Sequence, residues 1–424
     1  MTGSSVRDSC AFCGSRALER IIDFGEVALA GAFVKPRQFA SEPRYRLRAF
    51  FCTDCFALQL LDIVDPAQLF ANYFYFSSAI RSLREHFLDY ASEVVARFLK
   101  PERSTVVEIG CNDGILLKPL ADHGVHTPIG VDPATNIVQS IADPRITVVN
   151  DFFGAAVAAR IRSKHGPADL IVANNVYAHI PDINDVTGGV ADLLAPDGVF
   201  VFEVHHLGSV MRGLQYDMIY HEHLYYYSLL ALENHLRRHG LVVFDLKRIP
   251  IHGGSIRYYA CKSASRWAKA PTNRVLLLRQ DEAAQGLDRV ETFQHFASEI
   301  ARRKDTLMGF LERLRSAGKR VAGYGASGRA NTIIQYCGIG RGHMEYMIDD
   351  APAKWGYYTP GSHFEIRSAE ALRSAAPDYL VVFAWGYLNE IAEKCKPYLD
   401  AGGRLLTPLP EVRLMSHVNE ATRI

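Results

Sequence analysis

The sequence lacks the features that mark membrane, secreted and nucleic-acid-binding proteins. Its 424 residues include 47 lysines and arginines against 46 aspartates and glutamates, so the formal net charge is only +1. A protein that binds a phosphate backbone usually has a strongly basic face, which this balance does not favour. No apolar run approaches the roughly 20 residues that cross a bilayer, and the start, MTGSSVRDSC, has no apolar segment of the signal-peptide kind. We expect a cytoplasmic protein without membrane or nucleic-acid partners.

Cysteine is also scarce, but half of the eight cysteines are paired in the sequence. In a reducing cytosol thiols stay free, so C-x-x-C pairs favour a metal over disulfides. Two such pairs supply four thiolates, which suit tetrahedral zinc in a closed, structural site. The predicted zinc ligands are Cys10, Cys13, Cys52 and Cys55.

The rest of the chain alternates between apolar, strand-like runs and helical segments. TVVEIGCND, PIGVDPA, ITVVNDFF, DLIVANN and GVFVFEV form one series, and RVAGYGASGRANT opens a second. Such alternation predicts doubly wound parallel sheets. Between the two series, apolar residues at helical spacing predict one long amphipathic helix over residues 281–319. We expect an α/β protein with three domains: a zinc-binding domain (1–70), a Rossmann-like domain with a catalytic insert (71–310) and a second Rossmann-like domain (311–424).

The first strand of the first series ends in a glycine-containing turn, E-x-G-x-x-x-G. The middle glycine of a dinucleotide fingerprint, G-x-G-x-x-G, is replaced here by Asn112. That glycine normally lets the backbone approach the pyrophosphate closely, so the sequence does not clearly predict a pyrophosphate site. The next strand ends at Asp132, where a carboxylate can accept hydrogen bonds from both hydroxyls of a ribose. Asp151-Phe152 and Asn174 end the third and fourth strands.

This ordered set resembles the class I S-adenosylmethionine methyltransferases. The resemblance implies that the methyl donor is the cofactor, with a nicotinamide cofactor as the alternative. The residues it assigns to cofactor binding are Glu108, Gly110, Asn112, Gly114, Asp132, Asp151, Phe152 and Asn174.

A second chemical cluster follows in the segment DMIYHEH, residues 217–223. Tyr220, Glu222 and His223 lie close together, but the spacing is not that of an H-E-x-x-H zinc helix. A merely structural polar cluster is the alternative. His179, after the fourth strand, and the segment HGGSIR, residues 252–257, contribute further histidines and a cation.

Taken over residues 8–413, the chain resembles the sugar C-methyltransferases that act on nucleotide-linked 4-keto-6-deoxyhexoses. The motifs that carry the resemblance are the C-x-x-C pairs, the Tyr75–Ser78 stretch, VEIGCNDG, AHIPDI, IYHEH, HGGSIR, GYGASGRANT and YYTPG. In that family the three domains enclose one central site.

The resemblance implies a mechanism in which a base removes the proton beside the ketone, giving an enolate that takes the methyl group. His223 is the expected base, because imidazole titrates near neutral pH. Glu222 orients it, and Tyr220 with His179 stabilises the enolate oxygen. C3 is the favoured carbon and C5 the alternative. The residues assigned to the substrate are Tyr75, Ser77, Ser78, His252, Arg257, Ser327, Arg329 and Asn331.

The second glycine loop, G-x-G-x-x-G at residues 323–328, taken alone suggests a dinucleotide. In the resembled family the loop binds the diphosphate of the nucleotide sugar, which a helix N-terminus and Arg329 suit equally well.

The competing functions are a nucleic-acid base methyltransferase with a zinc module, an NAD-dependent sugar oxidoreductase and a non-enzymatic scaffold. Two departures from the family, His205-His206 and Gly386, affect sugar preference or are neutral. We expect a monomer.

Overall fold

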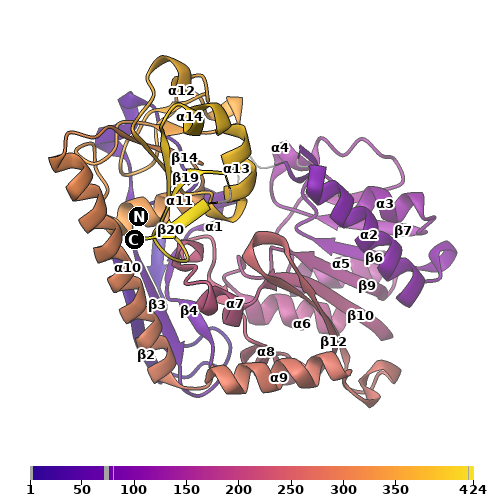
Figure 1. The fold of residues 1–424 in the computed structure, drawn as a ribbon. Helices are drawn as coiled ribbons and strands as arrows, with labels where there is room; N and C mark the ends of the chain where they lie inside the picture. The colour runs from indigo at the N-terminus through magenta and orange to yellow at the C-terminus, as the bar shows by residue number, and fades with distance from the viewer. Residues whose placement is uncertain (1–2, 71–75, 80, 419) are drawn as a thin grey trace. The chain divides into compact units, whose positions relative to one another are not determined.

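The computed structural model describes residues 3–70, 76–79, 81–418 and 420–424 and divides the chain into two compact units (Figure 1). The first unit comprises residues 1–18, 52–207 and 224–288, and the second comprises residues 19–51, 208–223 and 289–424. Each unit is therefore built from separate stretches of the chain. The predicted boundaries near residues 70 and 310 do not coincide with these limits, because compactness follows tertiary packing rather than chain order. The three-domain division stays a prediction.

A seven-stranded sheet forms the centre of the first unit, in the order β12-β13-β10-β9-β6-β7-β8. β10, β9, β6, β7 and β8 are parallel, and β13 and β12 add antiparallel pairs at one edge. The strands are β6 (Thr105–Ile109), β7 (Thr127–Val131), β8 (Thr147–Val149), β9 (Ala168–Asn174), β10 (Leu194–His205), β12 (Leu241–Ile249) and β13 (Ser255–Lys262). The strand order reverses between β6 and β9, which is where sheets of this kind bind ligands.

Helices cover this sheet, and short elements complete the unit. The helices are α1 (Pro66–Phe70), α2 (Arg81–Phe98), α3 (Leu117–Asp122), α4 (Thr135–Val138), α5 (Ala155–His165), α6 (Ile183–Leu193), α8 (Leu229–Arg238) and α9 (Asn273–Gln285). The 3-10 turns are η2 (Ser77–Ala79), η3 (Pro101–Arg103), η5 (Ile251–Gly253) and η6 (Arg266–Lys269). The short strands are β1 (Ser4–Val6), β4 (Leu58–Leu60), β5 (Asp62–Val64) and β11 (Tyr225–Tyr226).

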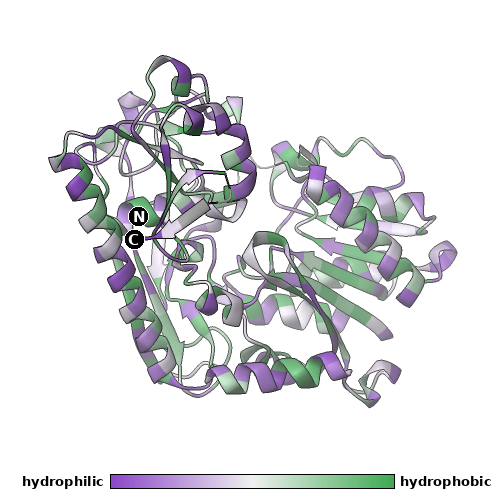
Figure 2. Ribbon diagram, in the orientation of Figure 1, coloured by the Kyte–Doolittle hydropathy of each residue, from purple (hydrophilic) through white to green (hydrophobic). Residues whose placement is uncertain are grey.

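The core of the first unit explains why these segments fold as they do. Val106, Leu170 and Val201, from three neighbouring strands, are fully buried, and Tyr90 and Val94 of α2 pack in the same cluster. Figure 2 shows the apolar strands of this sheet as a hydrophobic layer, whereas the helices carry both hydrophobic and hydrophilic residues. Burial of these apolar surfaces is the main stabilising contribution.

A second seven-stranded sheet forms the second unit, in the order β16-β15-β14-β17-β18-β19-β20. The first five strands are parallel and the last two are antiparallel. They are β14 (Val321–Tyr324), β15 (Met347–Ile348), β16 (Ile366–Arg367), β17 (Tyr379–Val382), β18 (Arg404–Thr407), β19 (Arg413–His417) and β20 (Glu420–Arg423). The order reverses between β14 and β17, so this sheet is also doubly wound.

Two long strands and several helices accompany this sheet. The strands are β2 (Leu18–Ala28) and β3 (Arg44–Cys52). The helices are α7 (Leu207–Arg212), α10 (Val290–Ser316), α11 (Gly328–Cys337), α12 (Ala371–Ser374), α13 (Leu388–Lys394) and α14 (Lys396–Asp400). The 3-10 turns are η1 (Pro36–Ser41), η4 (Tyr216–Met218), η7 (Pro352–Lys354) and η8 (Trp385–Tyr387).

The long amphipathic helix expected over residues 281–319 is present as α10 (Val290–Ser316), but it begins later than expected. Two helices, α9 and α10, occupy this part of the chain. Gly286 ends α9 in the left-handed conformation, with φ of 68°. Glycine adopts this conformation without a steric penalty and is the common residue at a helix C-terminus. In the part of the chain that the structure describes, no helix combines the length and the low polarity of a membrane span.

Candidate functional site

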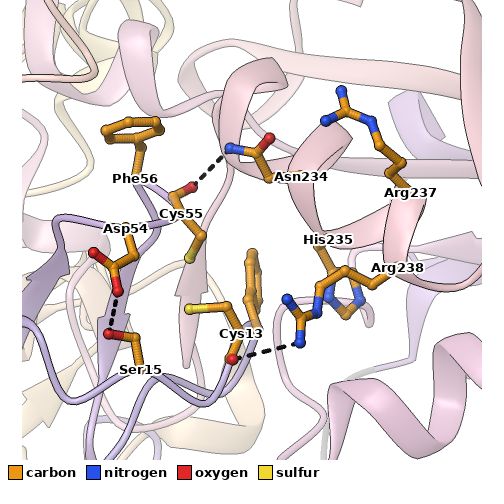
Figure 3. A pocket seen from close by; sticks show the side chains of 10 residues that line it. Cys13, Ser15, Asp54, Cys55, Phe56, Asn234, His235, Arg237 and Arg238 are labelled. Atoms are coloured by element: carbon orange, nitrogen blue, oxygen red, sulfur yellow. Dashed lines mark hydrogen bonds between the residues drawn. The ribbon is translucent and has the colours of Figure 1, made fainter.

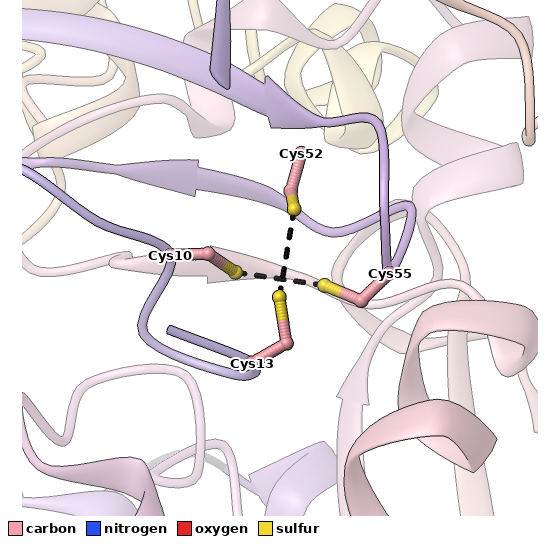
Figure 4. Close-up of side chains that lie close together, drawn as sticks. All are labelled: Cys10, Cys13, Cys52 and Cys55. Carbon is pink, nitrogen blue, oxygen red and sulfur yellow. Dashed lines mark hydrogen bonds between the residues drawn. The ribbon is translucent and has the colours of Figure 1, made fainter. Parts of the chain in front are cut away.

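The four paired cysteines come together in the first unit, as their spacing predicts. Their sulfur atoms lie within 4.8 Å of one another, and Figure 4 shows all four pointing toward a common centre. The Sγ atoms of Cys10 and Cys55 are 3.5 Å apart, and those of Cys13 and Cys52 are 3.7 Å apart. Four thiolates at about 2.3 Å from a tetrahedral zinc ion have their sulfur atoms about 3.8 Å apart. The cluster therefore fits zinc.

Neighbouring side chains hold this cluster in place. The buried amide of Gln59 donates to the Cys10 sulfur at 3.0 Å and accepts from the main-chain N–H of Ala11 at 2.9 Å. From α8, Asn234 and Arg238 donate to the carbonyl oxygens of Cys55 and Cys13. A cavity of about 550 Å³ opens beside the cysteines (Figure 3), and its lining includes these two residues together with Phe12, Ser15, Asp54, Phe56, His235 and Arg237. Because four ligands are protein thiols, the centre is closed and structural.

The turn after β6 adopts the geometry that its glycines require. Gly110 has φ of 69°, and a Cβ atom there would lie only 2.8 Å from the Val176 side chain. Asn112, in place of the middle fingerprint glycine, also lies in the left-handed region, at φ of 48°. Asparagine tolerates this conformation better than most residues. The turn therefore forms without the missing glycine, and Gly114, at φ of 77°, completes it.

Three acidic side chains lie near this turn. Burial, together with the neighbouring charges of Asp132 and Asp113, raises the pKa of Glu108 well above its ordinary value. Asn174 donates weakly to Glu108 Oε1, at 3.5 Å, whereas Glu108 Oε2 is buried and has no hydrogen-bond partner among the described residues. Burial also raises the pKa of Asp132, which accepts from the main-chain N–H groups of Asn112 and Ala134, both at 2.9 Å.

These carboxyls suit a ligand with positive charge. S-adenosylmethionine carries an ammonium and a sulfonium group against one carboxylate, so its net charge is positive. A buried acceptor without a partner, such as Glu108 Oε2, fits an N–H donor of the ligand. A nicotinamide dinucleotide carries a negative pyrophosphate and is a poor match for the three acids. The residues present therefore fit the methyl donor.

Asp151 and Phe152, expected beside the adenine, follow β8. Asp151 pairs with Arg160 at 2.8 Å, which lowers its pKa, and it also accepts from the Phe152 N–H. The Phe152 side chain is exposed at 50%, so its ring is accessible for stacking. Their assignment to the cofactor stays a prediction.

The segment that contains the expected base lies in the second unit. His223 is buried, and its Nδ1 atom lies 2.7 Å from the carbonyl oxygen of Met218. A carbonyl oxygen only accepts, so Nδ1 bears the proton and the neutral ring has its lone pair on Nε2. The Tyr220 ring lies 4.1 Å from the imidazole, between centroids. His221 instead bonds the Arg46 carbonyl oxygen, at 3.1 Å.

Burial shifts the pKa of two further residues of the expected catalytic set. It raises the pKa of Glu222 to about 7, so this carboxyl changes charge near neutral pH. It lowers the pKa of His179, in the first unit, to about 4, so this imidazole is neutral at pH 7. A neutral imidazole donates a hydrogen bond without being a strong acid.

The glycine loop of the second unit opens α11. Ser327 caps this helix, its Oγ accepting from the Ala330 N–H at 3.2 Å. Asn331 is fully buried, donates to the Ala30 carbonyl oxygen at 2.6 Å, and has its Oδ1 atom without a partner among the described residues. Both residues thus have structural contacts within the second unit, and their expected binding of substrate stays a prediction.

Arg329 is held by a buried acid. Asp217, at 0% exposure, accepts from Arg329 Nε at 2.8 Å and from Trp385 Nε1 at 2.9 Å. The guanidinium carbon also lies 5.0 Å from the centroid of the Trp385 ring. Sequence reasoning did not assign a role to Asp217 or Trp385, because the contacts join residues more than one hundred positions apart. These contacts orient the cation at the start of α11.

Arg257 belongs to a buried ionic network in the first unit. It is 2% exposed, pairs with Glu203 at 2.6 Å and Glu93 at 3.1 Å, and lies over the Tyr90 ring. His86 also bonds Glu203, at 2.9 Å. The charge of Arg257 is thus neutralised inside the unit, and its expected contact with substrate stays a prediction without support from this environment.

The remaining residues expected to bind substrate, and the two departures from the family, differ in their surroundings. Ser77 and Ser78 form η2, before α2. Tyr75 and the side chain of His252 lie outside the described part of the chain. Of the two departures, His206 is buried and pairs with Glu282 at 2.9 Å, which gives it a structural role. At Gly386 an added Cβ would have nothing within 4 Å, so the position has open space around it.

Family models match three consecutive parts of the chain. A zinc binding domain matches residues 10–70, a methyltransferase domain matches residues 82–246, and a C-methyltransferase C-terminal domain matches residues 250–410. The order agrees with the three predicted segments.

One relative matches almost the whole chain, and others match parts of it. The C-methyltransferase NovU of Streptomyces niveus is 33% identical over 410 residues, covering 96% of this chain and 97% of NovU. A ubiquinone biosynthesis O-methyltransferase of Bartonella tribocorum is 26% identical over 151 residues, covering 33% of this chain and 61% of the relative. A solved structure, the CcbJ methyltransferase from Streptomyces caelestis, is 15% identical, covers 42% of this chain and 89% of CcbJ, and has a TM-score of 0.34. With this match to NovU, the family models and its zinc-type cysteine cluster, the chain belongs to the S-adenosylmethionine-dependent C-methyltransferases.

Proposed function

We propose that the protein transfers a methyl group from S-adenosylmethionine to the carbon beside the ketone of a nucleotide-linked 4-keto-6-deoxy sugar. C3 is the favoured position and C5 the alternative. The observation that carries this proposal is the hydrogen bond between His223 Nδ1 and the Met218 carbonyl oxygen, because it selects the tautomer that a general base requires. Carbon methylation needs such a base, whereas methylation of an already nucleophilic heteroatom depends on it much less.

His223 removes the proton beside the ketone through Nε2. The carbonyl contact at Nδ1 stabilises the positive ring after proton transfer, because that N–H bond strengthens when the imidazole is charged. Glu222 can neutralise the same charge when it is ionised, and its pKa of about 7 makes this contribution sensitive to pH.

The enolate oxygen needs a hydrogen-bond donor, because a ketone α-carbon is a far weaker acid than imidazolium. Removing one such donor commonly costs about 10²–10³ in rate. The Tyr220 phenol, whose ring contacts the imidazole, and the neutral His179 imidazole are the proposed donors.

Each of the two doubly wound sheets binds one of the two substrates. When bound, S-adenosylmethionine supplies an electrophilic methyl group to the enolate carbon. Glu108, Asn112, Asp132 and Asn174 bind this donor. The N-terminus of α11 and the oriented Arg329 suit the diphosphate of the nucleotide sugar.

A mass-spectrometric assay tests the proposal. The full-length protein is incubated with S-adenosylmethionine and a panel of nucleotide-linked 4-keto-6-deoxy sugars generated in situ, alongside the matching 4-hydroxy sugars. We expect a gain of one methyl group only with the keto sugars, at a carbon assigned by NMR. Methylation of the 4-hydroxy sugars, or of oxygen or nitrogen in the product, would overturn the enolate mechanism.

A further inference from the structure

The segment Ser77-Ser78 is attached to the donor-binding turn by two consecutive hydrogen bonds. The main-chain N–H of Ser77 donates to Asn112 Oδ1 at 3.0 Å, and that of Ser78 donates to Asp113 Oδ2 at 3.1 Å. Arg84 donates in turn to the Ser78 carbonyl oxygen. Two neighbouring residues of one segment thus pair with two neighbouring residues of the other, across more than thirty positions of sequence.

Asn112 connects this attachment to the acid expected to bind the ribose. Its main-chain N–H donates to Asp132 Oδ2 at 2.9 Å, while its side chain accepts from Ser77. Its left-handed backbone, with φ of 48°, allows both bonds from one residue. A shift of Asp132 is therefore expected to displace Ser77 as well, because Asn112 is hydrogen-bonded to both residues.

Asp113 connects the attachment to Glu108, whose buried Oε2 atom fits an N–H donor of the ligand. Asp113 is 3% exposed, and its charge contributes to the raised pKa of Glu108. Its Oδ2 atom accepts from Ser78, whereas Oδ1 is buried and has no hydrogen-bond partner among the described residues. Three carboxyl groups (Glu108, Asp113 and Asp132) thus lie close together at this turn, where a positively charged ligand group reduces the repulsion among them.

We infer that Asn112 and Asp113 form a clasp through which binding of the methyl donor fixes the position of Ser77 and Ser78. The ammonium group, which S-adenosylmethionine and S-adenosylhomocysteine share, reduces the repulsion among the three carboxyls and so favours the arrangement in which Asp113 accepts from Ser78. Binding of the donor therefore raises the affinity for the second substrate, and by linkage the second substrate raises the affinity for the donor to the same extent. Asp113 acts as a positioning residue. The expectation that Ser77 and Ser78 contact the second substrate rests on the proposed function.

Hydrogen exchange of the Ser77 and Ser78 amides tests the clasp without any sugar. The full-length protein is measured with and without saturating S-adenosylhomocysteine, with fragmentation that resolves single amides. Couplings between sites are commonly 5–150-fold, so we expect these two amides to exchange about tenfold more slowly with the ligand. Equal exchange in both states overturns the inference, because a static cap of the segment needs no ligand.

Two variants at one position separate the clasp from general stability. Asp113→Ala removes the acceptor, and we expect ligand-dependent protection to be lost at Ser78 even at saturation confirmed by calorimetry. Asp113→Asn keeps an acceptor oxygen but not the carboxyl group, so we expect Ser78 to be protected to the same extent with and without the ligand. Asp122→Ala, which removes an exposed carboxylate paired with Arg145, is the matched control and should behave as the parent protein. Retained protection in Asp113→Ala overturns the role of Asp113.

These outcomes are independent of the sugar substrate. If the methylation assay fails with keto sugars while the exchange result holds, only the proposed function is wrong. If methylation succeeds while the amide exchange is unaffected by S-adenosylhomocysteine, only the clasp is wrong.

Discussion

The imidazole of His223 donates its Nδ1–H to the main-chain carbonyl oxygen of Met218, across 2.7 Å. The donor and acceptor are five residues apart on the same segment, so the tautomer is selected locally. The backbone conformation of residues 218–223 thus selects the tautomer of the base proposed for carbon methylation.

Replacement of His223 tests the base directly. His223→Asn removes Nε2, and we expect methyl transfer to fall by about 10²–10⁴-fold. Exchange of the sugar C3 proton with solvent deuterium should fall with it, because both steps share the enolate. His295→Asn, at a side chain that is 74% exposed, is the control. Turnover near that of the parent protein would clear His223 of this role.

Glu222 should confer a pH dependence near neutrality. Its folded pKa of about 7 lies above the reference value of 4.5, so its contribution to stability is fully present below pH 4.5 and is lost as the pH rises through 7. We expect Glu222→Gln to be more stable than the parent at pH 8, by about 1–3 kcal/mol, and no more stable at pH 4. Urea unfolding at the two pH values checks this, and an unchanged difference contradicts it.

The same substitution should change the activity profile. If ionised Glu222 supports the charged form of His223, kcat falls as the pH drops below 7, and Glu222→Gln flattens that limb while lowering the plateau. A profile with the same inflection in the variant would assign the inflection to another group.

Glu108 should link donor binding to proton release. Its carboxyl has a raised pKa in the free protein, and a bound cation favours the ionised form, so affinity should rise with pH. Glu108→Gln should weaken binding by about tenfold or more, equivalent to about 1.4 kcal/mol. Calorimetry in two buffers of different ionisation enthalpy measures the released protons. Glu102→Gln, at an exposed position six residues earlier in the sequence, is the control. NAD should bind neither the parent protein nor the Glu108→Gln variant.

Loss of a zinc ligand should affect folding rather than chemistry. Cys52→Ser leaves three thiolates, and structural zinc typically contributes about 10–16 kcal/mol of binding free energy to folding. We expect a lower unfolding temperature and less than one zinc per chain by metal analysis. Cys395→Ala removes a buried thiol outside the cluster and should keep its zinc. A stable Cys52→Ser protein that retains zinc but is inactive would contradict a structural role.

The sequence by itself determined the class of fold, the zinc ligands and the family. The reason is that these depend on local patterns: strand-like runs followed by glycine turns, two C-x-x-C spacings, and ordered motifs around Gly110 and Gly323. Each such pattern is short and has a strong geometric consequence, such as the left-handed conformation at Gly110. The break at Gly286 was also readable in principle, but an amphipathic period continues on both sides of it.

Only the tertiary structure decided what the polar side chains contact. Arg257 lies in the HGGSIR motif expected to bind substrate, yet carboxylates from α2 and β10 neutralise it. Arg329 is oriented by Asp217, and Ser78 is attached to Asp113, although nothing in the local sequence joins these pairs. Hydrogen bonds and ion pairs act over a few ångströms, so their partners are set by which segments the fold brings together, and a linear sequence does not contain that distance.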